Sequence, residues 1–221
     1  MATIEYSKDK GTYFSVLGDG KFHQTVDSKV EGAVLREYET SDGKKGSKYE
    51  LLAQSISGRI TGVSIFDGNF GKNVQVIFGN DEKPDDTIIV SLSAQGNYGE
   101  DFLKKLPNID ASKDVKLSPY AFEDDNGKKK KGMTVYQGDT KVQNYYSEEN
   151  KKTKKWTLIN GYPKPEGKTD TYDSDDWKLY YAGARKFLLT ELKKHPLYVE
   201  DVYAVKDADQ SDDITVESIP L

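Results

Sequence analysis

The sequence predicts a mainly β protein, an antiparallel barrel or sandwich with one long helix docked near its C-terminus. Short runs rich in Val, Ile, Tyr and Phe recur over the first two thirds of the 221 residues, and Gly, Asn and Asp separate them. Apolar side chains then repeat at three- and four-residue spacing over residues 174–195, which indicates the helix. The chain has no Cys, so disulfides and zinc–thiolate sites are excluded.

The expected strands follow one another along the first 146 residues. They cover residues 11–17, 30–39, 48–66, 72–79, 87–93, 115–123, 132–137 and 141–146. The run 48–66 is long for one straight strand, and we expect it to bend near Gly58 or Gly62 and to serve both halves of a small barrel. The link 67–72 predicts a hairpin turn, because Asp-Gly and a second Gly accept positive φ.

Two helices are expected. Residues 99–110 have acids in the first turn and lysines before Pro107, the polarity that the helix dipole favours. In the stronger prediction, 174–195, Ser174 caps the start and Pro196 follows the end. Its expected docking face consists of Trp177, Tyr180, Tyr181, Ala184, Phe187, Leu188 and Leu192.

Three segments follow from this pattern. They are a nucleic-acid-binding barrel over residues 1–165, a linker with the docked helix and an edge strand over 166–205, and a disordered acidic tail over 206–221. Residues 207–221 hold five acids and no Lys or Arg, so this tail cannot bury enough apolar area to offset its ordering entropy. No apolar run approaches about 18 residues, so we expect a cytoplasmic protein with no membrane partner.

A basic segment with interleaved rings predicts a binding site for single-stranded nucleic acid. Residues 128–155 hold nine lysines against three acids. Lysines neutralise phosphates, and rings stack on bases of any sequence for about 1–3 kcal/mol per base. The predicted phosphate contacts are Lys128, Lys129, Lys130, Lys131, Lys151, Lys152, Lys154 and Lys155, and the predicted stacking residues are Tyr136, Tyr145, Tyr146 and Trp156. The alternative is that the lysines form solvated loop tips and the rings face the core.

The hairpin at residues 66–75 is a second predicted contact surface. Phe66 and Phe70 flank its turn, and Arg59 and Lys72 lie close in sequence. Phe70 stands at the tip, where it is difficult to bury, and is predicted to stack on a base. The alternative is a hydrophobic cap on one end of the barrel.

The acidic tail predicts a detachable binding element. Its charges attract basic grooves at long range, and its apolar end fits a small pocket. The predicted contacts are Asp212, Asp213, Glu217, Ile219, Pro220 and Leu221. We expect the tail to occupy the basic groove when nucleic acid is absent and to recruit partner proteins when it is displaced. The alternative is a tail that only raises solubility.

Two resemblances extend this prediction. Asp212-Asp213-Ile214 followed by Ile219-Pro220-Leu221 resembles the acidic tip of bacterial single-stranded DNA-binding proteins, Asp-Asp-Ile-Pro-Phe. The stretches SISGRITGVSIFDGNFGKNVQVIF, DFLKKLPNID and VKLSPYAFEDDNGKKKKGMTVYQ, within residues 48–165, resemble a family of single-stranded DNA-binding proteins encoded by large tailed bacteriophages.

These resemblances imply an OB-type barrel with loop insertions that coats and protects single-stranded DNA in phage replication, recombination or repair. They imply replication and recombination proteins as partners of the tail, and the host cytoplasm as the location. A homo-oligomer is compatible with this function.

Catalysis is not expected, and neither is a metal or a cofactor. His23 and His195 are the only histidines, and neither has a nucleophile or ligand partner at recognisable spacing. Two alternatives stay open. One is a protein-interaction or virion protein, and the other is a nuclease in which Asp139-Thr140-Lys141 and Asp124 or Asp125 hold Mg²⁺.

Overall fold

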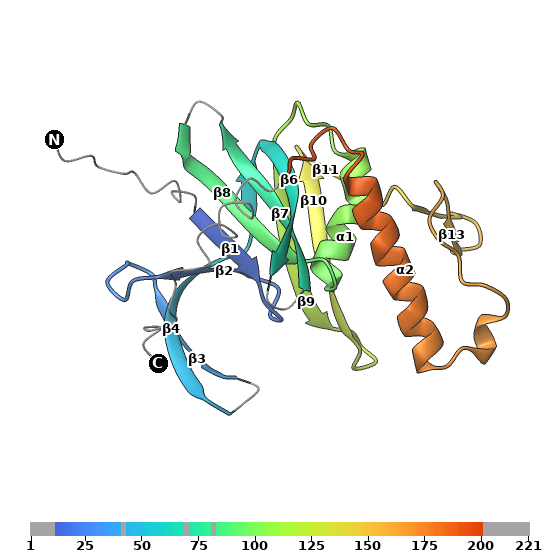
Figure 1. Cartoon of the computed structure of the whole chain (residues 1–221), viewed down its shortest axis with the longest axis horizontal. Helices are drawn as coiled ribbons and strands as arrows, with labels where there is room; N and C mark the ends of the chain where they lie inside the picture. The colour runs from blue at the N-terminus through green and yellow to red at the C-terminus, as the bar shows by residue number, and fades with distance from the viewer. Residues whose placement is uncertain (1–11, 41–42, 69–70, 81–82, 201–221) are drawn as a thin grey trace, which may run out of the picture.

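The computed structural model describes residues 12–40, 43–68, 71–80 and 83–200, which form a mainly β fold with two α-helices (Figure 1). The strands of the larger sheet are β1 (Thr12–Val16), β2 (Phe22–Val26), β3 (Val34–Glu39), β4 (Lys45–Ala53), β6 (Ile60–Gly68), β7 (Gly71–Asn80) and β8 (Lys83–Ser93). The smaller sheet has β5 (Ile56–Gly58), β9 (Val115–Glu123), β10 (Lys129–Gln137) and β11 (Thr140–Lys141). Strands β12 (Ser147–Glu149) and β13 (Trp156–Leu158) form a separate hairpin. The helices are α1 (Asn97–Lys105), α2 (Ser174–Leu192) and the 3₁₀ turns Leu106–Asn108 and Thr169–Thr171.

One apolar core lies between the two sheets and the two helices. The larger sheet contributes Val74, Val76, Phe78, Val90 and Leu92, the smaller sheet Val115, Leu117, Met133 and Val135, and the helices Phe102, Leu106, Ala184, Leu188 and Leu192. The contributing strand residues alternate along their strands, as expected for sheets with one buried face. The strands β7, β8 and β9 confirm the sequence prediction, and β9 has the predicted bounds.

The two sheets do not close into a barrel, so the predicted OB-like closure is wrong for the described residues. The larger sheet runs β3-β4-β2-β1-β8-β7-β6, and the smaller one β11-β10-β9-β5. Strand β5 pairs with β9 only from Val115 to Leu117. Pro119, two residues further along β9, has no amide hydrogen to donate, which is consistent with the end of this ladder.

The predicted strand 48–66 divides into β4, β5 and β6. Strands β4 and β6 belong to the larger sheet, whereas β5 belongs to the smaller one, so the chain crosses between the sheets and returns. Gly58, at the end of β5, has a φ of 159°. The expected bend is therefore confirmed, although it joins two open sheets instead of two halves of a barrel.

Helix α1 covers the free edge of β10 with its side chains. The Met133 amide donates to Asp101 Oδ2 (2.8 Å), and Lys105 Nζ donates to the Met133 carbonyl oxygen (2.6 Å). Asp101 and Lys105 also pair with each other. Burial lowers the pKa of Lys105, while the charge of Asp101 opposes that change. The two side chains replace a neighbouring strand and satisfy backbone groups that an open edge would expose.

Helix α2 lies beside α1 on one flank of the body (Figure 1). Its N-cap is Asp173, not Ser174 as predicted, because the Asp173 carboxylate accepts hydrogen bonds from the amides of Asp175 and Asp176. The helix has 19 residues and ends at Leu192, so the predicted long helix is not supported. Beyond it, the Val63 amide donates to the Leu197 carbonyl oxygen (2.7 Å), which places the start of the predicted edge strand beside β6.

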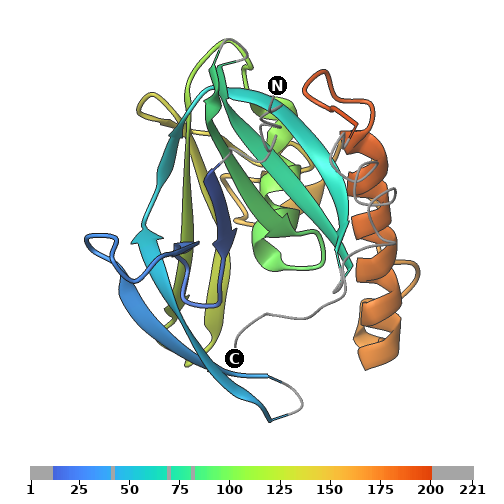
Figure 2. The same ribbon diagram turned by 60° about the vertical axis from the view of Figure 1, so that its left-hand side comes forward.

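Strands β3 and β4 form an arm that curves away from the other strands (Figures 1 and 2). Several large apolar side chains on this part of the sheet are exposed, namely Val34, Leu35, Tyr38, Tyr49 and Leu52. The sequence did not predict the arm as a separate feature, because its strands have the same alternation as the others. No helix in the described part of the chain is long and apolar enough to span a bilayer.

Candidate nucleic-acid interface

The turn end of the β9–β10 hairpin brings rings and lysines together. Tyr120 and Phe122 lie 5.8 Å apart between ring centroids, and Phe122 is 57% exposed. Lys130 is the direct cross-strand partner of Phe122, so the two side chains share one face of the hairpin. Lys128 and Lys129 are exposed at the same end. The predicted lysines therefore lie beside two rings that sequence reasoning missed.

Gly132 provides the space in which the Tyr120 ring lies. A Cβ at this position would be 2.4 Å from the Tyr120 hydroxyl oxygen and 2.6 Å from Asp101 Oδ2. Partial burial and the charge of Asp101 raise the pKa of Tyr120. The phenol is thus held neutral over the backbone of β10, with part of its ring exposed.

A second group of predicted residues lines a depression beside the β12–β13 hairpin, which we call the hairpin pocket. Its volume is about 630 Å³, and Tyr145, Lys151 and Trp156 all border it. Trp156 is 63% exposed and lies opposite Glu149 in the ladder. Lys152, Lys154 and Lys155 are exposed around the turn, and Lys154 lies 3.8 Å from Glu149. Exposed rings beside lysines are the mixture that binds unpaired nucleotides.

A second depression lies between α1, α2 and the β9–β10 hairpin, and we call it the helix pocket. Its volume is about 490 Å³, and Tyr120, Lys131, Asn144, Tyr181 and Arg185 are among its lining residues. Asn144 also lines the hairpin pocket, so the two depressions adjoin there. One lysine from each predicted cluster, Lys131 and Lys151, therefore lines each of two neighbouring pockets.

Tyr146 is a correction to the predicted contact set. It is only 4% exposed and packs against Tyr162 and Phe187 at ring-centroid distances of 5.6 and 5.5 Å. Burial raises its pKa to about 12. The ring belongs to the core and cannot stack on a base. Tyr136 is half-buried on β10 between Lys116 and Lys141 of the neighbouring strands, outside both pockets.

The β6–β7 hairpin confirms the predicted turn, because Gly68 pairs with Gly71. Lys72 Nζ lies 2.7 Å from Asp67 Oδ1, so the charge of this predicted phosphate contact is already paired within the hairpin. Phe66 is half-buried and Arg59 is exposed. Phe70 lies outside the described residues, as do the six predicted contacts of the tail.

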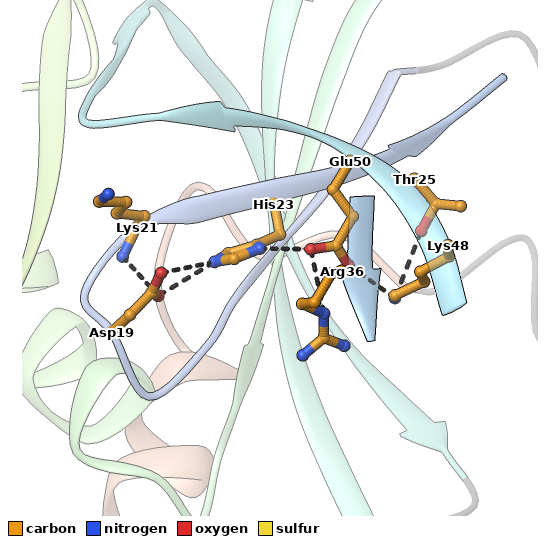
Figure 3. A network of polar contacts seen from close by, with 7 residues as sticks. All are labelled: Asp19, Lys21, His23, Thr25, Arg36, Lys48 and Glu50. Atoms are coloured by element: carbon orange, nitrogen blue, oxygen red, sulfur yellow. Dashed lines mark hydrogen bonds and ion pairs between the residues drawn. The ribbon is translucent and has the colours of Figure 1, made fainter. Parts of the chain in front are cut away.

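A polar network joins the arm to the β1–β2 turn (Figure 3). His23 Nδ1 lies 2.7 Å from Glu50 Oε2, and His23 Nε2 lies 3.0 Å from Asp19 Oδ1. Glu50 also contacts Arg36 Nε at 3.1 Å and Lys48 Nζ at 2.9 Å. The partner of His23 is 27 residues away, which is why sequence spacing did not reveal it.

The contacts of this network join strands β2, β3 and β4 to the β1–β2 turn, and we call the network the brace. Both ring nitrogens of His23 face carboxylates, so the imidazole links Glu50 to Asp19. Burial alone would raise the pKa of Glu50, but hydrogen bonds from Lys48 and His23 and the nearby positive charges outweigh it and lower that pKa. A deprotonated, buried Glu50 therefore holds β2, β3 and β4 together.

The brace also supports the β9–β10 hairpin. Asp19, its last member, precedes Gly20, whose φ is 75°. A Cβ at Gly20 would lie 2.3 Å from the Ala121 amide nitrogen, so the turn is in backbone contact with β9. Fixing Asp19 therefore fixes the turn against the strand that carries Tyr120 and Phe122.

The residues of the alternative nuclease site do not come together. Asp124 lies at the β9–β10 turn and Asp139 lies beyond the other end of β10, nine residues along an extended strand. At about 3.3 Å per residue the two carboxylates are roughly 30 Å apart, too far to share a metal ion. Asp124 instead accepts backbone hydrogen bonds from Asn126 and Lys128, which lower its pKa despite partial desolvation. Within the described ranges no three His, Asp or Glu side chains converge as a metal site.

No family model, curated protein or solved structure matches this chain. The functional argument therefore depends on the geometry of the site.

Proposed function

We propose that this protein binds single-stranded nucleic acid without base specificity, and that it coats and protects single-stranded DNA during phage replication, recombination or repair. The observation that carries the proposal is the hairpin pocket, where the exposed Trp156 stands beside Tyr145 and Lys151. Glu148 and Glu149 also line this pocket, and Lys152, Lys154 and Lys155 are exposed at the adjacent turn. Aromatic faces with lysines nearby suit a flexible polyanion that presents unstacked bases. The adjoining helix pocket and the β9–β10 hairpin extend the same mixture of groups.

The direct test is a fluorescence titration with oligo(dT). We expect quenching of the tryptophan emission and an affinity that falls with salt, with a slope of about 0.7 in log K per phosphate contact. Single-stranded DNA should compete better than duplex. If neither quenching nor a mobility shift occurs at low salt, the proposal is wrong.

The acidic tail keeps the role that the sequence predicts. We propose that residues 207–221 compete with the strand for basic side chains and recruit replication and recombination proteins when they are released. The tail carries five negative charges, and Lys131 and Lys151 each line one of the two pockets of the body. Deletion of 207–221 should tighten DNA binding at low salt. Equal affinity of both forms at every salt concentration would exclude competition.

A protein-interaction module is the second candidate function, and the arm favours it. Exposed apolar side chains on β3 and β4 are typical of surfaces that another protein covers. The same titration separates the two functions, because an interaction module would show no salt-dependent quenching by oligo(dT).

A further inference from the structure

The apolar face of α2 is longer than the body on which it packs. In its C-terminal half this face is buried through Ala184, Leu188 and Leu192. In the N-terminal half the same face carries Trp177 and Tyr181, and here the helix extends past the end of α1 in both views (Figures 1 and 2). Tyr181 is 44% exposed. Trp177 is half-buried and packs on Tyr172, with ring centroids 5.0 Å apart, whereas Tyr181 is left largely uncovered.

These rings form an ordered platform beside a cation. Trp177 and Tyr181 are stacked, with centroids 5.7 Å apart and ring planes 27° apart. Arg185 follows at the same four-residue spacing, so it lies next to Tyr181 along the helix. Tyr181 and Arg185 both line the helix pocket, and Arg185 Nη1 donates a long hydrogen bond of 3.4 Å to the Gln95 carbonyl oxygen.

The charges of the helix pocket favour an anion. Its two acids already have cationic partners, because Glu100 pairs with Lys104 and Asp101 pairs with Lys105. In the described part of the chain neither Arg185 nor Lys131 forms an ion pair with an acid. The uncompensated charge in this pocket is therefore positive.

The remaining groups select the class of anion. Tyr120 and Tyr181 present phenol rings to the pocket from β9 and α2, and the amides of Asn97 and Asn144 also line it. Rings stack on bases, amides bond to base edges, and Arg and Lys bind phosphate. A volume of about 490 Å³ is within the range of sites for small ligands.

We propose that the helix pocket binds one nucleotide of an unpaired strand, with the base on Tyr181 and the phosphate at Arg185. This inference rests on the proposed function and adds to it a site on α2 that lies outside the lysine-rich segment. The pocket adjoins the hairpin pocket at Asn144, so one strand passes from Trp156 to Tyr181.

The two tryptophans of the chain allow each site to be measured separately. Trp156 borders the hairpin pocket and Trp177 stacks on Tyr181, and there is no third Trp. In Trp156→Phe the tryptophan emission comes only from Trp177 on α2, and in Trp177→Phe it comes only from Trp156 on the β12–β13 hairpin. We expect oligo(dT) to quench both variants. Quenching in Trp177→Phe without quenching in Trp156→Phe overturns the inference while the proposed function stands, whereas binding by neither protein overturns both.

Substitutions test the named contacts. Tyr181→Ala should weaken oligo(dT) binding about 5- to 150-fold, the range for loss of one stacked base, and Tyr181→Phe should restore it. Arg185→Gln should lower the salt slope by about 0.7. Leu179→Ala is the control, because Leu179 is 76% exposed on the same helix and does not line the pocket. Thermal unfolding checks that each variant is folded.

Two results would contradict the assignment. Unchanged affinity in a folded Tyr181→Ala protein excludes stacking on this ring. Quenching of Trp177 in the Trp156→Phe protein by a neutral oligosaccharide, but not by oligo(dT), would assign the pocket to a sugar.

Discussion

The brace around Glu50 allows a stability prediction with a definite size. Glu50→Gln keeps the shape of the side chain but removes the charge that Arg36, Lys48 and His23 share. Breaking a buried ion pair from one side costs about 3–5 kcal/mol. The side chains of Arg36 and Lys48 are each 35% exposed and can regain hydration, so we expect a loss of about 2–3 kcal/mol.

The pH dependence of this loss has a definite sign. The pKa of Glu50 is lower in the folded protein than its ordinary value of 4.5. Its contribution to stability is therefore fully present above pH 4.5 and is lost as the pH falls through the lower, folded-state pKa. The difference between the two proteins should be largest near pH 7 and should shrink in acid.

Urea unfolding followed by circular dichroism at several pH values measures both effects. Glu37→Gln is the matched control, because Glu37 is an exposed neighbour on β3 and should change stability by less than about 0.5 kcal/mol. A Glu50→Gln protein as stable as the wild type, or a difference that grows in acid, would refute the reasoning.

Three further predictions follow from single contacts. Gly20→Ala should lower the free energy of unfolding in urea by about 2 kcal/mol or more, because φ at this position is positive and the new Cβ would overlap Ala121. Gly138→Ala is the control and should lose less, because Gly138 also has a positive φ but nothing lies within 4 Å of its Cβ position. Equal losses would show that the close approach to Ala121 has no effect. Tyr146→Phe should reduce the fall in stability between pH 10 and pH 12. The raised pKa of Tyr146 contributes stability that is present below pH 10 and is lost as the pH rises through about 12. An identical fall in both proteins, measured by urea unfolding, would contradict that shift. Lys151→Gln should lower the salt slope of oligo(dT) binding by about 0.7, and Lys29→Gln, an exposed lysine on the loop before β3, should leave it unchanged; the same slope in both variants would exclude the contact.

The strands were predictable where alternation and turn residues agree. Strands β7, β8 and β9 alternate clearly and are bounded by Gly, Asp or Ser, so their existence and approximate bounds follow from the sequence. The segment 141–146 also alternates, but only Thr140–Lys141 forms a strand. Its backbone is satisfied elsewhere, because the Tyr145 amide donates to the Lys104 carbonyl oxygen and the Tyr146 amide to Asn144 Oδ1. Such partners are set by tertiary structure and leave no periodic signal.

The sequence predicted which kinds of residue form the candidate site, but not which individual residues belong to it. The lysine-rich segments were found because charge and rings coincide in the sequence, yet adjacent tyrosines have opposite fates: Tyr145 borders the hairpin pocket and Tyr146 lies in the core. The periodicity of α2 predicted the buried positions Ala184, Leu188 and Leu192, but Tyr181 of the same predicted face is exposed. The pattern could not show that the body covers only part of this face.

Helix α1 is the reason that the rings and cations beside β10 line a pocket and do not lie on a flat sheet face. Its Asp101 and Lys105 occupy the backbone groups of β10 at Met133, so no further strand can pair there. The edge of the sheet is consequently bordered by a helix that is only nine residues long, and α2 extends beyond it. The helix pocket runs along one face of α1 and is bounded by Tyr120 on one side and Tyr181 on the other. The proposed function therefore predicts a preference for single strands here, because a duplex, whose bases are already stacked and paired, offers these rings no free face.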